Sequence, residues 1–245
     1  MIVLRRSGDR LLERQGAQIR WLTFAPGHDA DPLADGFFAL QRLNELELRP
    51  GGHAPSDQHV YAEVVTYVRE GTLRQEDSMG STGLLHADNI QLRTARLDHY
   101  HREVNASRTA SVHLFQLWLR LAAPGPGSAP EQRRFSAADR RGLLTLVAAP
   151  DLRRGSLHLH QDARIYSALL QRGRHVVHEV SPGRVAWLHV VDGELALGDL
   201  VLNAGDGAGL TDERAASVTA RAACELLLVD LAESRPKIPT NGGAA

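Results

Sequence analysis

The chain has 245 residues, which is enough for two domains of about 100–120 residues or one large β-domain. Its formal net charge is −1 and its pI is near 6.9, so charge gives no reason to expect nucleic acid or an anionic membrane surface as a partner. No apolar run approaches the roughly 18–20 residues that span a bilayer, and the single cysteine, Cys224, excludes an internal disulfide, so we expect a cytoplasmic protein.

Short apolar runs separated by glycine turns dominate the chain and predict an all-β protein with few short helices. One helix is expected at Ser136–Leu146, where Ser136 is a candidate cap and Asp139 adds charge to the first turn. The expected strands include Ala62–Val68, Leu114–Leu121, Val185–Val191, Asp199–Leu202 and Glu225–Leu231.

A linker rich in proline and glycine divides the chain into two similar halves. Val68-Arg-Glu-Gly71-Thr-Leu resembles Val190-Val-Asp-Gly193-Glu-Leu, and His86-Ala-Asp88 has a counterpart ending at Asp206. These matches lie 122 and 118 residues apart, which indicates an internal duplication. We therefore predict two tandem β-barrels, with residues 1–121 and 136–232 as the barrels, 122–135 as the linker and 233–245 as a tail.

Two clusters in the first half have the residue types of a metal site. Asp57 and His59 are two residues apart, and so are His101 and Glu103, so each pair points to one face if it lies on a strand. Two imidazoles and a carboxylate form a set that binds Fe(II) or a similar ion and leaves positions open. The alternative is a polar solvent-facing strand, because twelve histidines supply accidental pairs.

The same segments resemble a known family. Asp57-Gln-His59-Val-Tyr-Ala-Glu63-Val-Val-Thr-Tyr-Val-Arg-Glu-Gly71 resembles the first motif of the pirins, which belong to the cupin superfamily. Arg74–Gly80, Gln91–Ala95, the His-x-Glu at His101–Glu103 and Phe115–Leu119 also resemble segments of that family.

The resemblance implies a bicupin, built from two jelly-roll barrels, that holds a metal, usually iron, in its first barrel. The implied ligands fall on Asp57, His59, His101 and Glu103, with Fe(II) as the expected ion and another divalent transition metal as the alternative. Asp57 departs from the pattern, because the family has histidine there. Glu63 falls on the glutamate ligand of many other cupins, whereas the pirin pattern implies a neighbour of the site, so ligand, base and outer-shell partner all stay open for it.

The duplication predicts that the second barrel lacks a metal. The offsets of 122 and 118 residues place Glu179, Ser181 and Val185 against the first motif, and Thr219 and Arg221 against the second. Only one of these five residues is a potential ligand. His158 and His160 are expected to have a structural or surface role.

Two functions of different classes follow from the resemblance. The first is an enzyme, a metal-dependent dioxygenase of the quercetin 2,3-dioxygenase type that acts on a flavonol-like small molecule. The second is a non-enzymatic regulatory protein, with or without a metal, that binds a protein partner. Fold alone does not decide between an enzyme and a binding protein.

Overall fold

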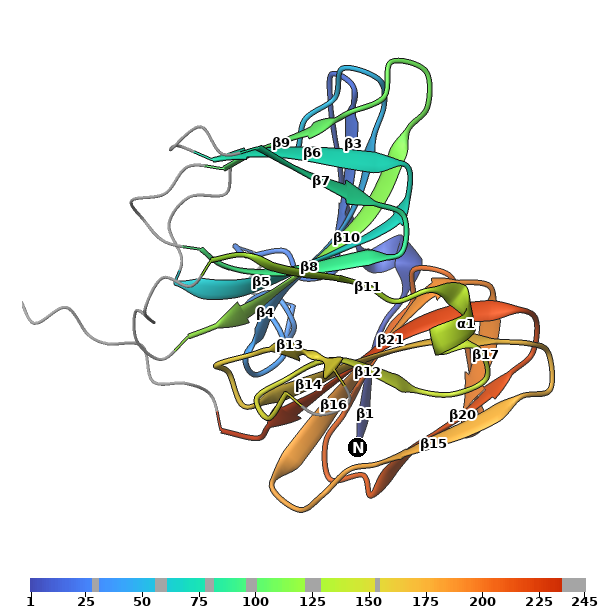
Figure 1. Cartoon of the computed structure of the whole chain (residues 1–245). Helices are drawn as coiled ribbons and strands as arrows, with labels where there is room; N and C mark the ends of the chain where they lie inside the picture. Colours follow the sequence, from blue (N-terminus) through green and yellow to red (C-terminus); the bar gives the residue numbers. More distant parts are fainter. Residues whose placement is uncertain are drawn as a thin grey trace, which may run out of the picture.

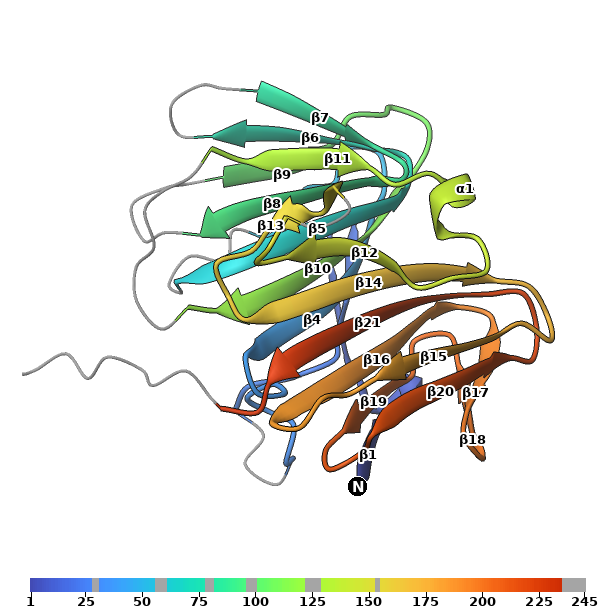
Figure 2. The ribbon, with the colours of Figure 1, turned by 60° about the horizontal axis from the view of Figure 1, so that its bottom comes forward.

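The computed structural model describes residues 1–27, 31–55, 61–77, 82–95, 101–121, 129–152 and 155–234. These residues form an all-β protein of two similar units, which lie one above the other in Figure 1. Each unit consists of one large sheet facing one small sheet, and the two large sheets pack against each other, as the turned view in Figure 2 shows.

The first unit has a seven-stranded and a three-stranded sheet. The large sheet has the order β11 (Glu131–Arg134), β8 (Asn89–Ala95), β5 (Ala62–Glu70), β10 (Val112–Arg120), β4 (Leu40–Leu48), β3 (Gln18–Leu22) and β2 (Leu11–Gln15). The small sheet has the order β7 (Thr82–His86), β6 (Thr72–Asp77) and β9 (His101–Asn105).

The second unit repeats this plan with a seven-stranded and a four-stranded sheet. The large sheet has the order β1 (Ile2–Arg5), β19 (Gly207–Leu210), β16 (Arg184–Asp192), β21 (Cys224–Ala232), β14 (Ala163–Leu170), β12 (Thr145–Ala149) and β13 (Leu157–His158). The small sheet has the order β15 (His175–Glu179), β20 (Ala215–Ala220), β17 (Glu194–Leu197) and β18 (Leu200–Asn203).

The two units exchange strands at their ends. The N-terminal β1 pairs with β19 of the second unit, and β11, which follows the linker, pairs with β8 of the first. The η1 turn (Ser7–Asp9) leads from β1 into the first unit. The division at residues 122–135 remains our proposal for where the units separate in sequence, with these two strands exchanged across it.

The predicted helix at Ser136–Leu146 is wrong in its length. The helix α1 spans only Ala137–Arg140, and Ser136 caps it by accepting a hydrogen bond from the Asp139 amide, as expected. Gly142 has a φ of +73°, which a continuing helix does not allow, and Thr145–Ala149 forms β12. The five predicted strands are all present, each within two residues at either end.

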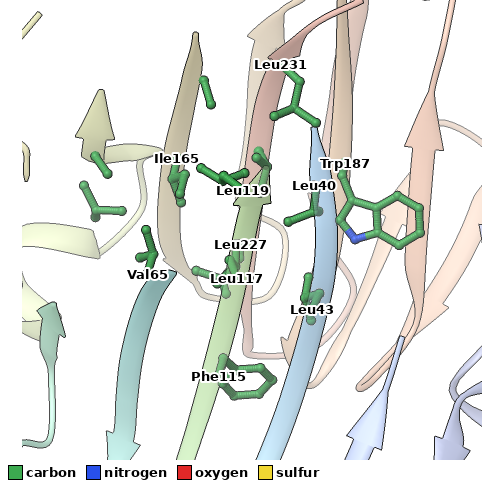
Figure 3. Close-up of a cluster of buried hydrophobic side chains, with 14 of the residues drawn as sticks. Leu40, Leu43, Val65, Phe115, Leu117, Leu119, Ile165, Trp187, Leu227 and Leu231 are labelled. Carbon is green, nitrogen blue, oxygen red and sulfur yellow. The ribbon is translucent and has the colours of Figure 1, made fainter. Parts of the chain in front are cut away.

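The main core lies between the two units. One face of each large sheet contributes to a single buried apolar cluster, and Figure 3 shows residues from both sides of it. Val65, Phe115 and Leu117 come from the first unit, and Trp187 and Leu227 come from the second. Alternate residues of β5 and β10 therefore face the second unit, while the residues between them face the interior of their own unit.

A buried ion network connects the units beside this core. The Glu225 carboxylate accepts hydrogen bonds from Arg140 at 2.7 Å and from the Tyr67 hydroxyl at 2.6 Å. Arg140 also donates to Asp88 at 2.7 Å, and Arg69 donates to Glu225 at 3.2 Å. Burial, followed by the neighbouring Glu225 charge, raises the pKa of Tyr67, so the hydroxyl stays protonated as a donor.

No helix in the described ranges is long and apolar enough to cross a membrane.

Candidate metal and ligand site in the first unit

The interior of the first unit is arranged in levels along its strands. At one end lies a closed apolar floor from both sheets, which includes Leu46, Val68, Leu73, Leu85 and Leu114. Inward-facing residues recur at every second position along each strand, and the register pairs them across neighbouring strands. They therefore form successive layers that begin at this apolar floor.

A level of polar residues follows above the floor. On the large sheet, Gln91, Thr66, Gln116 and Asn44 are direct register neighbours across β8, β5, β10 and β4. Gln75 and Glu103 face them from paired positions on β6 and β9. We call these six residues the polar belt.

Glu103 is the described member of the predicted ligand set. Its side chain is buried, and its Oε1 accepts from Gln75 at 2.9 Å, while its Oε2 accepts from Gln116 at 2.7 Å. The Arg93 guanidinium lies 3.5 Å from Oε1. A carboxylate offers about four lone-pair positions, so Glu103 retains capacity for a further ligand.

The remaining predicted ligands fall partly outside the description. Asp57 and His59 lie outside the described residues, two to four residues before the described chain resumes ahead of β5. His101 begins β9 two residues before Glu103, and its backbone pairs with Asp77. Among the described residues, no group of three or more His, Cys, Asp or Glu side chains could hold a metal ion. The four-residue ligand set therefore stays a prediction.

Glu63 does not face this interior, which contradicts the expectation that it lies beside the site. Its buried carboxylate accepts the backbone amides of His160 at 2.7 Å and Gln161 at 2.8 Å, both from the second unit. The His160 ring lies 3.0 Å from the same carboxylate. The odd positions of β5 face the second unit, so Glu63 is neither a base nor an outer-shell partner of the site. The structural role expected for His160 is confirmed.

The second unit lacks the polar belt. Gly71 and Gly193 end equivalent hairpins, and the registers counted from them match each belt residue to one in the second unit. Thr66 corresponds to Leu188 and Gln116 to Leu228, and the remaining four counterparts are Ala208, Leu197, Val218 and Tyr166. The sequence offset of 118 residues matched His101 and Glu103 to Thr219 and Arg221, and this match is wrong. The strand registers give an offset of 115 residues between β9 and β20, so the counterparts are Ala216 and Val218.

One polar cluster in the second unit escaped the sequence analysis. His178 lies 2.7 Å from Asp230, which also accepts from Arg184, and Arg184 donates to Asp162 at 2.8 Å. Burial raises the pKa of Asp230, but the hydrogen bonds from His178 and Arg184 outweigh it and lower the pKa. This carboxylate is used in ion pairs, and among the described residues the cluster is not a group that could hold a metal ion.

The belt residues Thr66 and Gln116 also escaped notice. Each is a single polar residue within an apolar strand, in Val64-Val-Thr66-Tyr-Val68 and in Phe115-Gln116-Leu-Trp118. A polar residue at an inward position of a buried strand is the signal that could have identified them, because buried polar groups need partners.

Two tandem units with this strand order, of which only the first has the polar belt, define a bicupin. Residues 23–119 match the family model described as Pirin, and residues 146–231 match that of the quercetinase C-terminal cupin domain. A protein of Escherichia coli K12 named quercetin 2,3-dioxygenase is 35% identical over 231 residues, 94% of this chain and 99% of that one. A pirin-like protein of Caulobacter vibrioides is 30% identical over 224 residues, 89% and 95% of the two chains.

Solved structures agree with these relatives. The crystal structure of YhhW from Escherichia coli has a TM-score of 0.86 at 35% identity, covering 94% of this chain and 97% of that one. The structure of bacterial pirin YhhW in complex with nickel(II) has a TM-score of 0.86 at 34% identity, covering 95% and 99%. The chain belongs to the pirin family.

Proposed function

We propose that the protein is a metal-dependent dioxygenase of the quercetin 2,3-dioxygenase type, acting on a flavonol-like small molecule inside the first unit. The observation that carries this proposal is the contrast between the units: the first retains a buried polar belt around Glu103, and the second replaces the equivalent positions with apolar residues and one tyrosine. The quercetin dioxygenase names of relatives support the reaction class.

The donor set fits a divalent transition metal. Asp57, His59, His101 and Glu103 would hold it, and their mixture of imidazole and carboxylate suits Fe(II), Mn(II) or Ni(II). Gln75 and Gln116 fix the Glu103 carboxylate, as hydrogen-bonded outer-shell groups do around ligating carboxylates. We propose Fe(II) as the native ion, and the nickel(II) complex of YhhW supports a divalent metal in general. When bound, the metal supplies open positions for the substrate oxygen and dioxygen.

The protein's own contribution is orientation and proton handling. The amide groups of Gln75 and Gln116 each donate to one oxygen of Glu103 and so hold its carboxylate at a fixed position. Because Glu63 faces the second unit, Glu103 is the described carboxylate that can accept the proton of a substrate hydroxyl. The apolar floor closes the interior behind the belt and limits the access of water.

The test is metal retention by untagged protein loaded anaerobically with Fe(II). Wild type should keep near-stoichiometric metal, and His59→Ala and His101→Ala should each lose most of it. His175→Ala, at an exposed histidine of the second unit, is the matched control and should retain wild-type metal. Equal metal content in wild type and His59→Ala would contradict the site.

Oxygen consumption tests the reaction. Uptake with a flavonol panel should require both the metal and His101. A protein that keeps its metal but consumes no oxygen across the panel would instead support the alternative function, a pirin-like regulator that binds a protein partner.

A further inference from the structure

Arg93 is a buried cation inside the first unit. Its side chain is 10% exposed, and its strand position is opposite Val64, whose side chain is also in the interior. Among the described residues its polar contact is with Glu103 at 3.5 Å, and its Nε is buried without a hydrogen-bond partner. The guanidinium therefore has donors that the described protein does not use.

Arg140, buried between the two units, is paired more completely, although its Nε also lacks a hydrogen-bond partner. Arg140 donates to Glu225, Asp88 and Tyr67, with distances of 2.7 to 2.8 Å. Buried charges are normally paired and hydrogen-bonded in this way, because an unpaired charge loses its hydration without compensation. Since Glu103 already accepts shorter bonds from Gln75 and Gln116, it satisfies Arg93 only in part.

Other polar atoms on the inward face of the large sheet also lack partners. Three are acceptors of the polar belt, namely Asn44 Oδ1, Thr66 Oγ1 and Gln91 Oε1, and one is the Trp118 indole Nε1, a donor. Trp118 and Arg93 lie on either side of Val64 at one level of the large sheet, directly above the belt. Unpartnered buried atoms from four strands converge on one interior, which is how a site for a polar ligand is lined.

The fold itself does not require Arg93. The second unit has Leu210 at the equivalent position, opposite Ala186, where it packs within an apolar cluster. The same architecture therefore accepts an apolar residue at this position. Among the described residues only the 3.5 Å contact with Glu103 offsets the desolvation of this cation, and an anionic ligand would complete the pairing.

We propose that the first unit binds its ligand as an organic anion and that Arg93 is the specificity-determining counter-ion. The anionic group is an oxygen, either of a carboxylate or of an ionised enol or phenol, both of which a guanidinium recognises through paired N–H donors. The belt acceptors then receive hydrogen bonds from the ligand's hydroxyl groups. This inference rests on the proposed function and names the charge state of its substrate.

The experiment uses metal-free protein, so binding is measured apart from catalysis. Two matched pairs of probes share a ring system, and one member of each pair carries a charge: 2-naphthoate with 2-naphthamide, and 3-hydroxyflavone, titrated through its ionisation, with 3-methoxyflavone. Calorimetry gives the affinity, and quenching of Trp118 fluorescence reports the location, with Trp118→Phe as its control. Wild type should bind the charged member of at least one pair roughly tenfold or more tightly than the neutral one, because a charge-assisted hydrogen bond contributes that much.

Arg93→Leu should abolish that preference and leave binding of the neutral probe unchanged, whereas Arg93→Lys should keep part of it. Arg164→Gln, in the second unit, is the matched loss of an arginine and should change neither affinity. The melting temperature of Arg93→Leu should equal or exceed that of wild type. The pair that shows the preference identifies carboxylate or ionised enol as the ligand group.

Equal affinities within both probe pairs in wild type would overturn the proposal, and so would an Arg93→Leu variant that weakens charged and neutral probes equally. Either result leaves metal retention and oxygen uptake untouched, so failure here is distinguishable from failure of the proposed function. If metal retention fails while the charge preference holds, the unit binds an anion without the proposed reaction.

Discussion

His189 should make the protein less stable at mildly acidic pH. This side chain lies on β16 in the interface between the units, fully buried, with its ring 5.8 Å from Phe115. Neither ring nitrogen has a hydrogen-bond partner among the described residues. Burial, followed by the Arg10 charge, lowers the pKa of His189 to about 3, although Glu45 and Asp206 oppose the shift.

The sign of the effect follows from the two protonation states. His189 is neutral in the folded protein, and in the unfolded chain it gains a proton below its ordinary pKa of 6.5. Stability is therefore complete above pH 6.5 and falls as the pH drops toward 3. At pH 5 the loss for this group is about 2 kcal/mol, since each unit of pKa corresponds to about 1.4 kcal/mol.

Urea unfolding at intervals from pH 8 to pH 5 measures this slope in wild type and in His189→Leu. The variant should lose the His189 part of the slope and equal or exceed wild-type stability at pH 5. Glu45 adds little to the slope between pH 8 and pH 5. Burial raises its pKa, but hydrogen bonds from His113 and Arg10 lower it to about 2. Identical pH slopes in the two proteins would refute the reasoning.

Two further predictions concern the interface and the hairpins. Glu225→Gln should reduce the free energy of unfolding by about 3–5 kcal/mol, because it leaves the buried Arg140 short of a counter-charge. Denaturant unfolding measures the loss, with Glu194→Gln, in a partly exposed ion pair, as the control, and a loss below about 1 kcal/mol would contradict the buried-pair argument. Gly193→Ala should destabilise far more than Gly173→Ala, although both have a φ near +80°, because only at Gly193 would the new Cβ meet backbone atoms. Equal losses of melting temperature would show that the φ strain alone matters.

The strand positions could be predicted because they depend on local sequence. Apolar runs such as Ala62–Val68 have strand length, and the hairpin glycines Gly71 and Gly193 both adopt φ near +80°, which other residues rarely tolerate. The expected helix failed because its capping signal at Ser136 is local, whereas its end depends on Thr145–Ala149 pairing with β14 of the large sheet.

The side-chain partners could not be predicted because they come from distant parts of the chain. Glu63 belongs to a motif that precedes metal ligands in many cupins, yet its partners His160 and Gln161 are about a hundred residues later. Its inward or outward direction depends on which face of β5 the second unit covers. The same holds for Arg140 and Glu225, which are 85 residues apart. A sequence shows that such charges exist, but not which ones meet.

The two units together separate what the fold needs from what a site needs. The second unit shows that this strand order is compatible with Leu188, Leu228 and Val218 at the levels where the first unit has Thr66, Gln116 and Glu103. The buried polar side chains of the first unit therefore lower its folding stability, and apolar residues at the same positions would remove this loss. The shared apolar core and the ion network between the large sheets supply stability without depending on that interior. A unit stabilised from outside can keep unpaired polar atoms inside, and those atoms are the ones available to a metal and its ligand.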